Sequence, residues 1–274
     1  MNKVNPVIFS VGSFTIRWYS VIMLLAIFIG LYLLKRESDR LNFKYDFIFN
    51  MCFWAIIFGY LSARLYYVIF NLDYYTANPG EIFAIWKGGL AIHGGIIGGL
   101  LTCALYCYKY KTRLIRYTDM ICVPLILGQA IGRWGNFFNS EAHGAATTLE
   151  HLQKLHIPQF IIDGMKIDGV YYTPTFLYES VACLIVFIIL IIIRRSKLRK
   201  VGTISALYLI SYGIIRFFIE ISRTDALMIA GIKVAQIVSI IMIIIGLLIL
   251  SKNKKKGRFE DLYNDVNNKD NLKY

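Results

Sequence analysis

Charged residues are scarce in this chain of 274 residues. Only 17% are Asp, Glu, Lys or Arg, whereas 57% are hydrophobic and 15% are aromatic. A soluble globular domain carries about 25% charged residues. The low charge therefore excludes an ordinary soluble domain and identifies an integral membrane protein.

Acidic residues are the scarcer sign, which leaves a formal net charge of +13. A basic surplus can indicate nucleic-acid binding, but that function needs a continuous basic stripe with interleaved aromatic side chains. Here the basic residues lie in short segments between apolar runs. We therefore expect no nucleic-acid partner and attribute the basic residues to membrane topology.

Cysteine is also uncommon, and no pairs of cysteines lie in the loops between apolar runs. This pattern argues against a disulfide framework. Cys103 and Cys107 share one helix face, but no histidine or carboxylate lies near them in the sequence to complete a metal site. We expect no metal, and we expect all five cysteines to pack as small apolar side chains: Cys52, Cys103, Cys107, Cys122 and Cys183.

Seven apolar runs are long enough to cross most of a bilayer as helices. A small-residue cleavage motif is missing after the first run, so we expect a retained span and not a cleaved signal peptide. The fourth run contains Pro124 and glycines, which predicts an interrupted helix. The sequence thus predicts an all-α polytopic membrane protein with seven transmembrane helices, at about 18–34, 47–70, 88–108, 118–134, 174–193, 203–221 and 233–250.

Alternate loops differ strongly in their basic residues. Apart from Arg133 and Arg223, one set of loops contains eighteen Lys and Arg residues and the other contains six. The positive-inside rule makes the richer set cytoplasmic, with the N-terminus outside and the C-terminus inside. We expect residues 1–251 to form one membrane-embedded domain with an outer loop at about 135–173. The polar tail, 252–274, is predicted to be a disordered cytoplasmic segment.

Polar residues gather in the stretch 132–144, which reads G-R-W-G-N-F-F-N-S-E-A-H-G. Ionisable groups beside a membrane span are costly, so they indicate a functional site more often than not. The alternative is a solvated loop in which the glycines only make turns. The predicted topology places further polar residues of other spans toward the same outer side: Tyr19, Arg64, His93, Glu179, Arg216 and Glu220.

The sixth run has polar residues at helical spacing. Tyr212, Arg216, Glu220 and Arg223 follow one another at intervals of four, four and three, which places them on one helix face. An Arg216–Glu220 pair could serve only to tie helices together. Arg64 and Arg133 add to the positive charge, however, and a surplus of guanidinium groups favours a bound lipid phosphate.

Four motifs together resemble those of the bacterial prolipoprotein diacylglyceryl transferase family. The stretch 132–144 resembles the signature G-R-x-G-N-F-x-N-x-E-x-x-G of that family, and 86–95 resembles W-x-G-G-x-x-x-H-G-G. The segment 174–180 resembles P-T-F-L-Y-E-S, and the helix with Tyr212 and Arg223 is similar to the sixth-span motif. The motifs occur in the family's order and cover most of the chain.

The resemblance implies transfer of the diacylglyceryl group of phosphatidylglycerol to the lipobox cysteine in the signal-peptide region of a prolipoprotein. The products would be a thioether and glycerol phosphate. This is the first step of lipoprotein maturation at the bacterial cytoplasmic membrane, with the site toward the outer leaflet. From the residues and the resemblance together, the expected catalytic residues are His93, Arg133, Glu141 and Arg216, and the expected substrate-binding residues are Tyr19, Arg64, Asn136, Asn139, Gly144, Glu179, Tyr212, Glu220 and Arg223. Arg64 follows from the predicted topology and the charge surplus and belongs to none of the four motifs.

The chemistry needs a base but no cofactor. A free thiol has a pKa of about 8.5, so attack on a glyceryl carbon requires a base or a cationic setting that favours the thiolate. Either His93 or Glu141 could do so, and His93, flanked by glycines, could equally be a structural hydrogen-bonding residue. Two other functions fit buried arginines: a transporter or channel for an anionic solute or lipid, and a different membrane lipid transferase.

Overall fold

The computed structural model describes residues 5–12, 14–84, 88–196, 199–224, 228–229 and 231–253. Within these residues the chain is mostly helical, as predicted. Trp86, Lys87 and almost all of the tail, 254–274, lie outside the described residues. The larger helices are α1 (Trp18–Arg40), α2 (Tyr45–Ile69), α4 (Ile92–Lys109), α5 (Leu114–Asn139), α8 (Thr175–Arg194), α9 (Thr203–Ser222) and α10 (Val234–Asn253).

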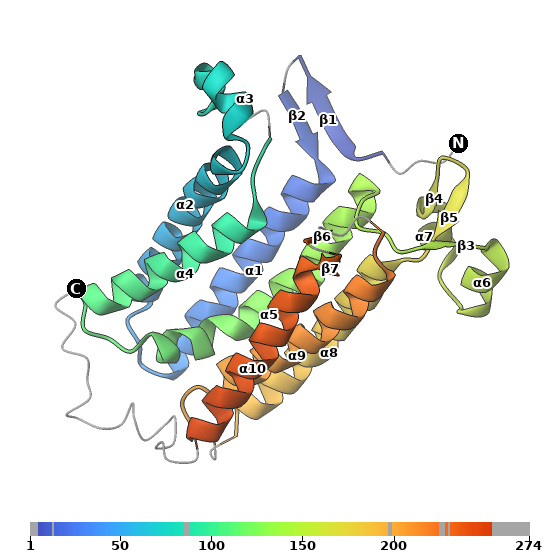
Figure 1. Cartoon of the computed structure of the whole chain (residues 1–274). Helices are drawn as coiled ribbons and strands as arrows, with labels where there is room; N and C mark the ends of the chain where they lie inside the picture. The colour runs from blue at the N-terminus through green and yellow to red at the C-terminus, as the bar shows by residue number, and fades with distance from the viewer. Residues whose placement is uncertain are drawn as a thin grey trace. The chain divides into compact units, whose positions relative to one another are not determined.

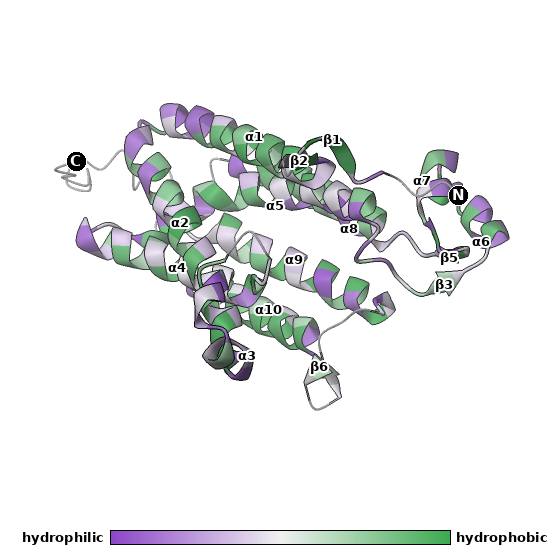
Figure 2. Cartoon of the chain, turned by 90° about the horizontal axis from the view of Figure 1, so that it is seen from above, coloured by the Kyte–Doolittle hydropathy of each residue, from purple (hydrophilic) through white to green (hydrophobic). Residues whose placement is uncertain are grey.

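Six of the described helices are long and apolar enough to cross a membrane, namely α1, α2, α5, α8, α9 and α10. The remaining predicted span, 88–108, corresponds to the helix α4, which is not among these six; its 18 residues include four glycines, His93 and Lys109. In Figure 2 the middle of α1 is hydrophobic, whereas its C-terminal end, with the sequence K-R-E-S-D-R, is hydrophilic. The protein is therefore a multi-pass membrane protein.

The described chain forms two compact units. The first contains residues up to Glu37 and from Thr118 onward, and the second runs from Ser38 to Tyr117. In the second unit, α2 and α4 lie side by side, and α3 (Leu72–Ala77) and the 3-10 turn η1 (Pro79–Glu81) follow the end of α2 (Figure 1).

The first unit packs α8 against α9, and α9 against α10 (Figure 1). One hydrophobic core joins α5, α8 and α9, and nine of its residues are buried: Cys122, Val123, Ile126, Ala130, Cys183, Val186, Leu190, Ile204 and Tyr208. The hydroxyl of Ser180 donates to the carbonyl of Ala130 at 2.8 Å, which fixes α8 against α5 within this core.

Helix α5 differs from the expected interrupted span. It is one helix of 26 residues with Pro124 inside it, and it continues past residue 135 to Asn139. Aromatic packing explains the extension, because Phe138 stacks on Trp18 with ring centroids 5.1 Å apart and Phe137 contacts Phe176 at 4.8 Å. The long connection between α5 and α8, predicted to be the outer loop, thus begins after Asn139, and most of the signature is helical.

Short strands, which the hydropathy pattern does not predict, join the helices. β1 and β2 form an antiparallel hairpin before α1, and β6 and β7 form another before α10. In the connection between α5 and α8, β3, β5 and β4 form a three-stranded sheet beside the short helices α6 (Leu149–Lys154) and α7 (Gln159–Gly164). The strands are β1 (Val7–Val11), β2 (Phe14–Arg17), β3 (Ala146–Thr147), β4 (Lys166–Ile167), β5 (Val170–Tyr172), β6 (Met228–Ile229) and β7 (Ile232–Lys233).

Helix α9 is held by charged side chains at both ends. The buried carboxylate of Asp119, on α5, accepts hydrogen bonds from the backbone N–H groups of Gly202 and Ser205 at 2.6 and 2.8 Å. At the other end, the ammonium group of Lys233 donates to the carbonyls of Glu220, Ile221 and Arg223 at 2.6, 3.2 and 2.8 Å. Each charge opposes the helix dipole and satisfies backbone groups that have no partner inside the helix.

Candidate active site

Five charged side chains of alternating sign form a continuous ion-paired series across α5, α8 and α9. We call it the charged cluster, and its members in order of contact are Arg133, Glu179, Arg216, Glu220 and Arg223. All five belong to the first unit. Together they carry one more positive than negative charge.

Glu179 is at the centre of the first half of the cluster. Its carboxylate lies 2.6 Å from Nη2 of Arg133 through Oε1 and 3.3 Å from Nη1 of Arg216 through Oε2. The hydroxyl of Tyr212 donates to Oε1 at 3.4 Å. The side chain of Glu179 is only 2% exposed, whereas those of Arg133 and Arg216 are 18% and 17% exposed. The two arginines are therefore anchored by a buried carboxylate and still reach the surface of the protein.

Glu220 extends the series along α9, where helical spacing brings the pairs together as predicted. Its Oε2 lies 2.8 Å from Nη2 of Arg216, one turn earlier, and 3.9 Å from Nη1 of Arg223. Lys233 holds the backbone of this same end of α9. Sequence reasoning missed this lysine, because its position just before α10 carries no signal that it caps a different helix.

The signature asparagines orient Glu141. Both Asn136 and Asn139 donate from Nδ2 to Oε1 of Glu141, each at 3.1 Å. Asn136 also accepts a long hydrogen bond from Nη1 of Arg133, at 3.4 Å. The last turns of α5 therefore connect the exposed carboxylate of Glu141 to the charged cluster through one amide side chain.

Gly144 joins the outer loop to the end of α9. It forms an isolated antiparallel bridge with Arg223, and its N–H donates to the carbonyl of Thr173 at 2.9 Å. Next to it, the hydroxyl of Thr175 donates to the carbonyl of Ala142 at 2.7 Å. These contacts bring the signature, the start of α8 and the end of α9 together at one place.

Tyr19 packs against the signature through a glycine. A Cβ atom on Gly135 would lie 2.6 Å from Cδ2 of the Tyr19 ring, so only glycine allows this approach. The ring thus lies against α5 two residues after Arg133. The other residues expected at the site, Arg64 and His93, belong to the second unit.

Arg64 is buried and bonded to backbone carbonyls. It donates from Nε to Ile82, from Nη2 to Glu81, and from Nη1 to Gly88 and Gly89, at distances of 2.7 to 2.9 Å. Both glycines have positive φ, 86° and 73°. A Cβ on Gly89 would lie 2.5 Å from Nη1 of Arg64. These contacts favour a loop-holding role for Arg64 over the phosphate contact expected from the sequence.

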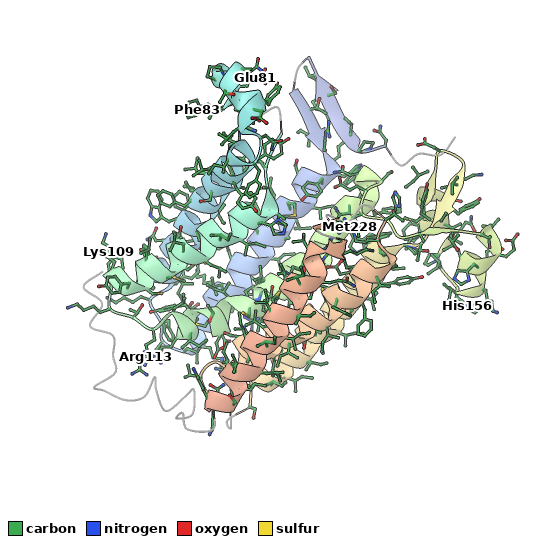
Figure 3. All side chains as sticks on the ribbon, in the orientation of Figure 1. Glu81, Phe83, Lys109, Arg113, His156 and Met228 are labelled. Carbon is green, nitrogen blue, oxygen red and sulfur yellow. The ribbon has the colours of Figure 1, made fainter. Side chains whose placement is uncertain are left out.

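The loop held by Arg64 leads directly into the first turn of α4, which contains His93. The N–H of Ala91, the residue before α4, donates to the carbonyl of Ala63 at 3.0 Å. The ring of His93 is half-buried, with its centroid 6.4 Å from that of Tyr66. Glu81 and Phe83 lie beside α3, whereas Lys109 marks the far end of α4 (Figure 3). The hydrogen bonds between Arg64 and the Gly88–Gly89 pair thus help to fix where the backbone enters the first turn of α4, which contains His93.

Comparison with known proteins gives one consistent result. The family model described as prolipoprotein diacylglyceryl transferase matches residues 6–252. The phosphatidylglycerol--prolipoprotein diacylglyceryl transferase of Staphylococcus saprophyticus is 46% identical over 257 residues, which are 93% of this chain and 92% of that protein. The protein of that name from Listeria innocua is 46% identical over 93% and 92% of the two chains. Its counterpart from Bacillus velezensis is 41% identical over 96% and 97%. The chain therefore belongs to the prolipoprotein diacylglyceryl transferase family.

Proposed function

We propose that this protein transfers the diacylglyceryl group of phosphatidylglycerol to the lipobox cysteine of a prolipoprotein. The observation that carries the proposal is the pair of partly exposed arginines, Arg133 and Arg216, held on one buried carboxylate. Guanidinium groups bind phosphate through two parallel donors, and a fixed pair is preorganised to do so. Family membership supplies the substrates that such a phosphate site would serve.

In the proposed reaction the cysteine sulfur of the prolipoprotein attacks the glyceryl carbon that carries the phosphate. A carbon–sulfur bond forms, the carbon–oxygen bond breaks, and the electron pair of that bond remains on the phosphate oxygen. Negative charge grows on the departing glycerol phosphate, and Arg133 and Arg216 stabilise it. No metal or organic cofactor takes part in this step.

The proton of the thiol passes to Glu141 or His93. Glu141 has its Oε1 held by two asparagines, which orients the carboxylate. A general base must be deprotonated to act, so the rate falls as the pH drops and the base takes up a proton. The pH dependence of kcat/KM in Glu141→Gln and His93→Gln therefore identifies the base, because only loss of the true base removes the acidic limb of the profile.

We also propose seven spans, with the N-terminus outside, the C-terminus in the cytoplasm and the charged cluster toward the outer leaflet of the bacterial cytoplasmic membrane. The excess of basic residues in alternate loops supports this orientation. A reporter fused after Lys252 should behave as cytoplasmic, and one inserted in α6 should behave as external. The reverse result at either site would contradict the orientation.

The function is tested with purified protein, phosphatidylglycerol and a synthetic lipobox peptide, without an energy source. We expect thioether-linked peptide and glycerol phosphate in equal amounts, and none with a peptide that carries serine in place of the cysteine. Movement of lipid between leaflets without peptide modification would favour a transporter. A modified peptide with a different leaving group would indicate another class of lipid transferase.

A further inference from the structure

The charge of the phosphate changes during the proposed reaction. Phosphatidylglycerol is a phosphodiester with one negative charge, whereas glycerol phosphate is a monoester whose second pKa is about 6, so it carries nearly two charges at neutral pH. A site built only of arginines would bind the dianionic product more tightly than the substrate. Such a site would be slow to release its product.

The charged cluster is not built only of arginines. Its three arginines and two glutamates leave a net charge of +1, which matches the charge of a phosphodiester. Glu179 lies between Arg133 and Arg216, the two cations with 18% and 17% of their side chains exposed. A phosphate bound to both guanidinium groups would therefore lie close to this carboxylate.

We propose that Glu179 is a specificity-determining residue that selects the monoanionic phosphodiester over the dianionic monoester. This inference rests on the proposed function and assigns Glu179 a task at that site beyond holding the arginines. Its fixed negative charge repels the second charge that appears on the phosphate when the carbon–oxygen bond breaks. The repulsion promotes release of glycerol phosphate after each turnover.

Glu179 is suited to this task because its charge is held in place. It is 2% exposed and contacts cations from two helices, Arg133 on α5 and Arg216 on α9. Tyr212 adds a hydroxyl group on the same carboxylate oxygen as Arg133. Ser180, the next residue, ties this turn of α8 to α5. These contacts fix the conformation of the Glu179 side chain, so its carboxylate stays close to a phosphate bound by the two arginines.

Two water-soluble probes differ in the charge of their phosphate: glycerophosphoglycerol, a phosphodiester with one negative charge, and glycerol phosphate, a monoester with nearly two. Their dissociation constants would be measured by calorimetry on the full-length protein, above the second pKa of the monoester. We expect wild type to bind the diester at least as tightly as the monoester. Tighter binding of the monoester to wild type, by about tenfold or more, would overturn the proposal without any variant, since an arginine-only site predicts that order.

Glu179→Gln keeps the shape of the side chain and removes its charge. One unit charge about 6 Å from the phosphate, at an effective dielectric constant of about 20, changes the preference between the two probes by at least about tenfold. We expect Glu179→Gln to shift the ratio of the two dissociation constants by this factor in favour of the monoester. A parallel loss of both affinities would show that Glu179 only positions the arginines, and an unchanged ratio would also contradict the proposal.

Glu37→Gln is the matched control. Glu37 is equally buried, at 2% exposure, and pairs with Arg194 at 3.5 Å, toward the opposite end of α1 from Tyr19. This variant should leave the ratio unchanged. The transfer assay on the same preparations separates the two hypotheses: a wild type that makes no thioether defeats the proposed function, whereas active protein with an unchanged ratio in Glu179→Gln defeats only this inference.

Discussion

Two arginines, the partly exposed Arg133 and the buried Arg64, are surrounded by different kinds of acceptor. Arg133 meets the carboxylate of Glu179 and the amide of Asn136, both of which are side chains. Arg64 meets the backbone carbonyls of Glu81, Ile82, Gly88 and Gly89. The side chain of Arg133 is 18% exposed, whereas Arg64 as a whole residue is 7% exposed.

We propose that this difference separates an arginine that binds the phosphate from one that holds a loop. An arginine held by a carboxylate at one edge still has donors for an anion at the other edge. An arginine that donates to four carbonyls of a loop has few N–H donors left for a ligand. Removing it leaves buried carbonyls unpaired. A substitution at Arg133 should therefore lower mainly the transfer rate, and one at Arg64 should lower mainly the free energy of unfolding.

Arg133→Lys should give the largest effect on the reaction. Lysine keeps the charge but not the planar pair of donors, so the phosphate loses a contact that strengthens as the leaving group departs. We expect a loss of about 3 kcal/mol in transition-state stabilisation, or on the order of a hundredfold in rate. The measurement is the transfer rate at saturating lipid, normalised to folded protein. Equal rates would remove Arg133 from the catalytic residues and make it an interfacial residue for which lysine serves as well.

Arg64→Lys should act mainly on stability. An ammonium group has three donors and cannot reproduce the fork that reaches four carbonyls, so we expect a loss of about 2 kcal/mol in the free energy of unfolding. The rate per folded molecule should fall much less than in Arg133→Lys. Thermal unfolding in detergent, compared with the transfer rate at a permissive temperature, checks both statements. A normal Tm with a rate as low as that of Arg133→Lys would place Arg64 at the phosphate instead.

Lys233→Met tests whether the C-terminal end of α9 must be held in place for the charged cluster to support the transfer reaction. Loss of the ammonium group leaves three carbonyls of the last turn without their charged donor, at a cost of about 1 kcal/mol. Because Glu220 and Arg223 lie on this turn, we expect a rate loss of roughly fivefold, from the same order of free energy. Lys233→Arg should recover most of the rate. If Lys233→Met keeps both its Tm and its rate, the cap does not position the cluster.

Replacing the five cysteines, which lie in α2, α4, α5 and α8, should change the transfer rate least of all. The attacking sulfur belongs to the prolipoprotein, so neither region of the enzyme needs a thiol. A variant with Ala or Ser at all five positions should transfer diacylglyceryl within about twofold of the wild-type rate, because volume changes are small. Selective loss of activity from one substitution, at normal abundance in the membrane, would point to a covalent enzyme intermediate.

The sequence predicts the helices and one face of α9, because apolar length and helical spacing depend only on local geometry. Arg216 and Glu220 are one turn apart and must meet on any regular helix. The partner of Arg133 could not be predicted in this way, since Glu179 is 46 residues away and its contact depends on how α5 and α8 are rotated about their axes. The same limit applies to Lys233, in β7, and to Asp119, in α5, which both cap α9.

Hydropathy also misplaced the end of α5. The polar signature reads as the start of a loop, but Phe137 and Phe138 bury their rings against Phe176 and Trp18 and keep the last turns helical. As a result, Asn136 and Asn139 point from one helix end toward Glu141. The carbonyl partners of Arg64 could not be predicted either, because every residue has a backbone carbonyl and the sequence does not indicate which ones accept a hydrogen bond.

We propose that the charged cluster binds the phosphate and that Arg64 does not. Binding of glycerol phosphate to folded wild type, Arg133→Gln and Arg64→Gln tests it most directly, with Kd measured by calorimetry. We predict that Arg133→Gln weakens binding by at least about tenfold, as expected for loss of a charge-assisted contact, whereas Arg64→Gln stays within about threefold of wild type. Equal weakening in the two variants, or weakening in Arg64→Gln alone, would contradict the account.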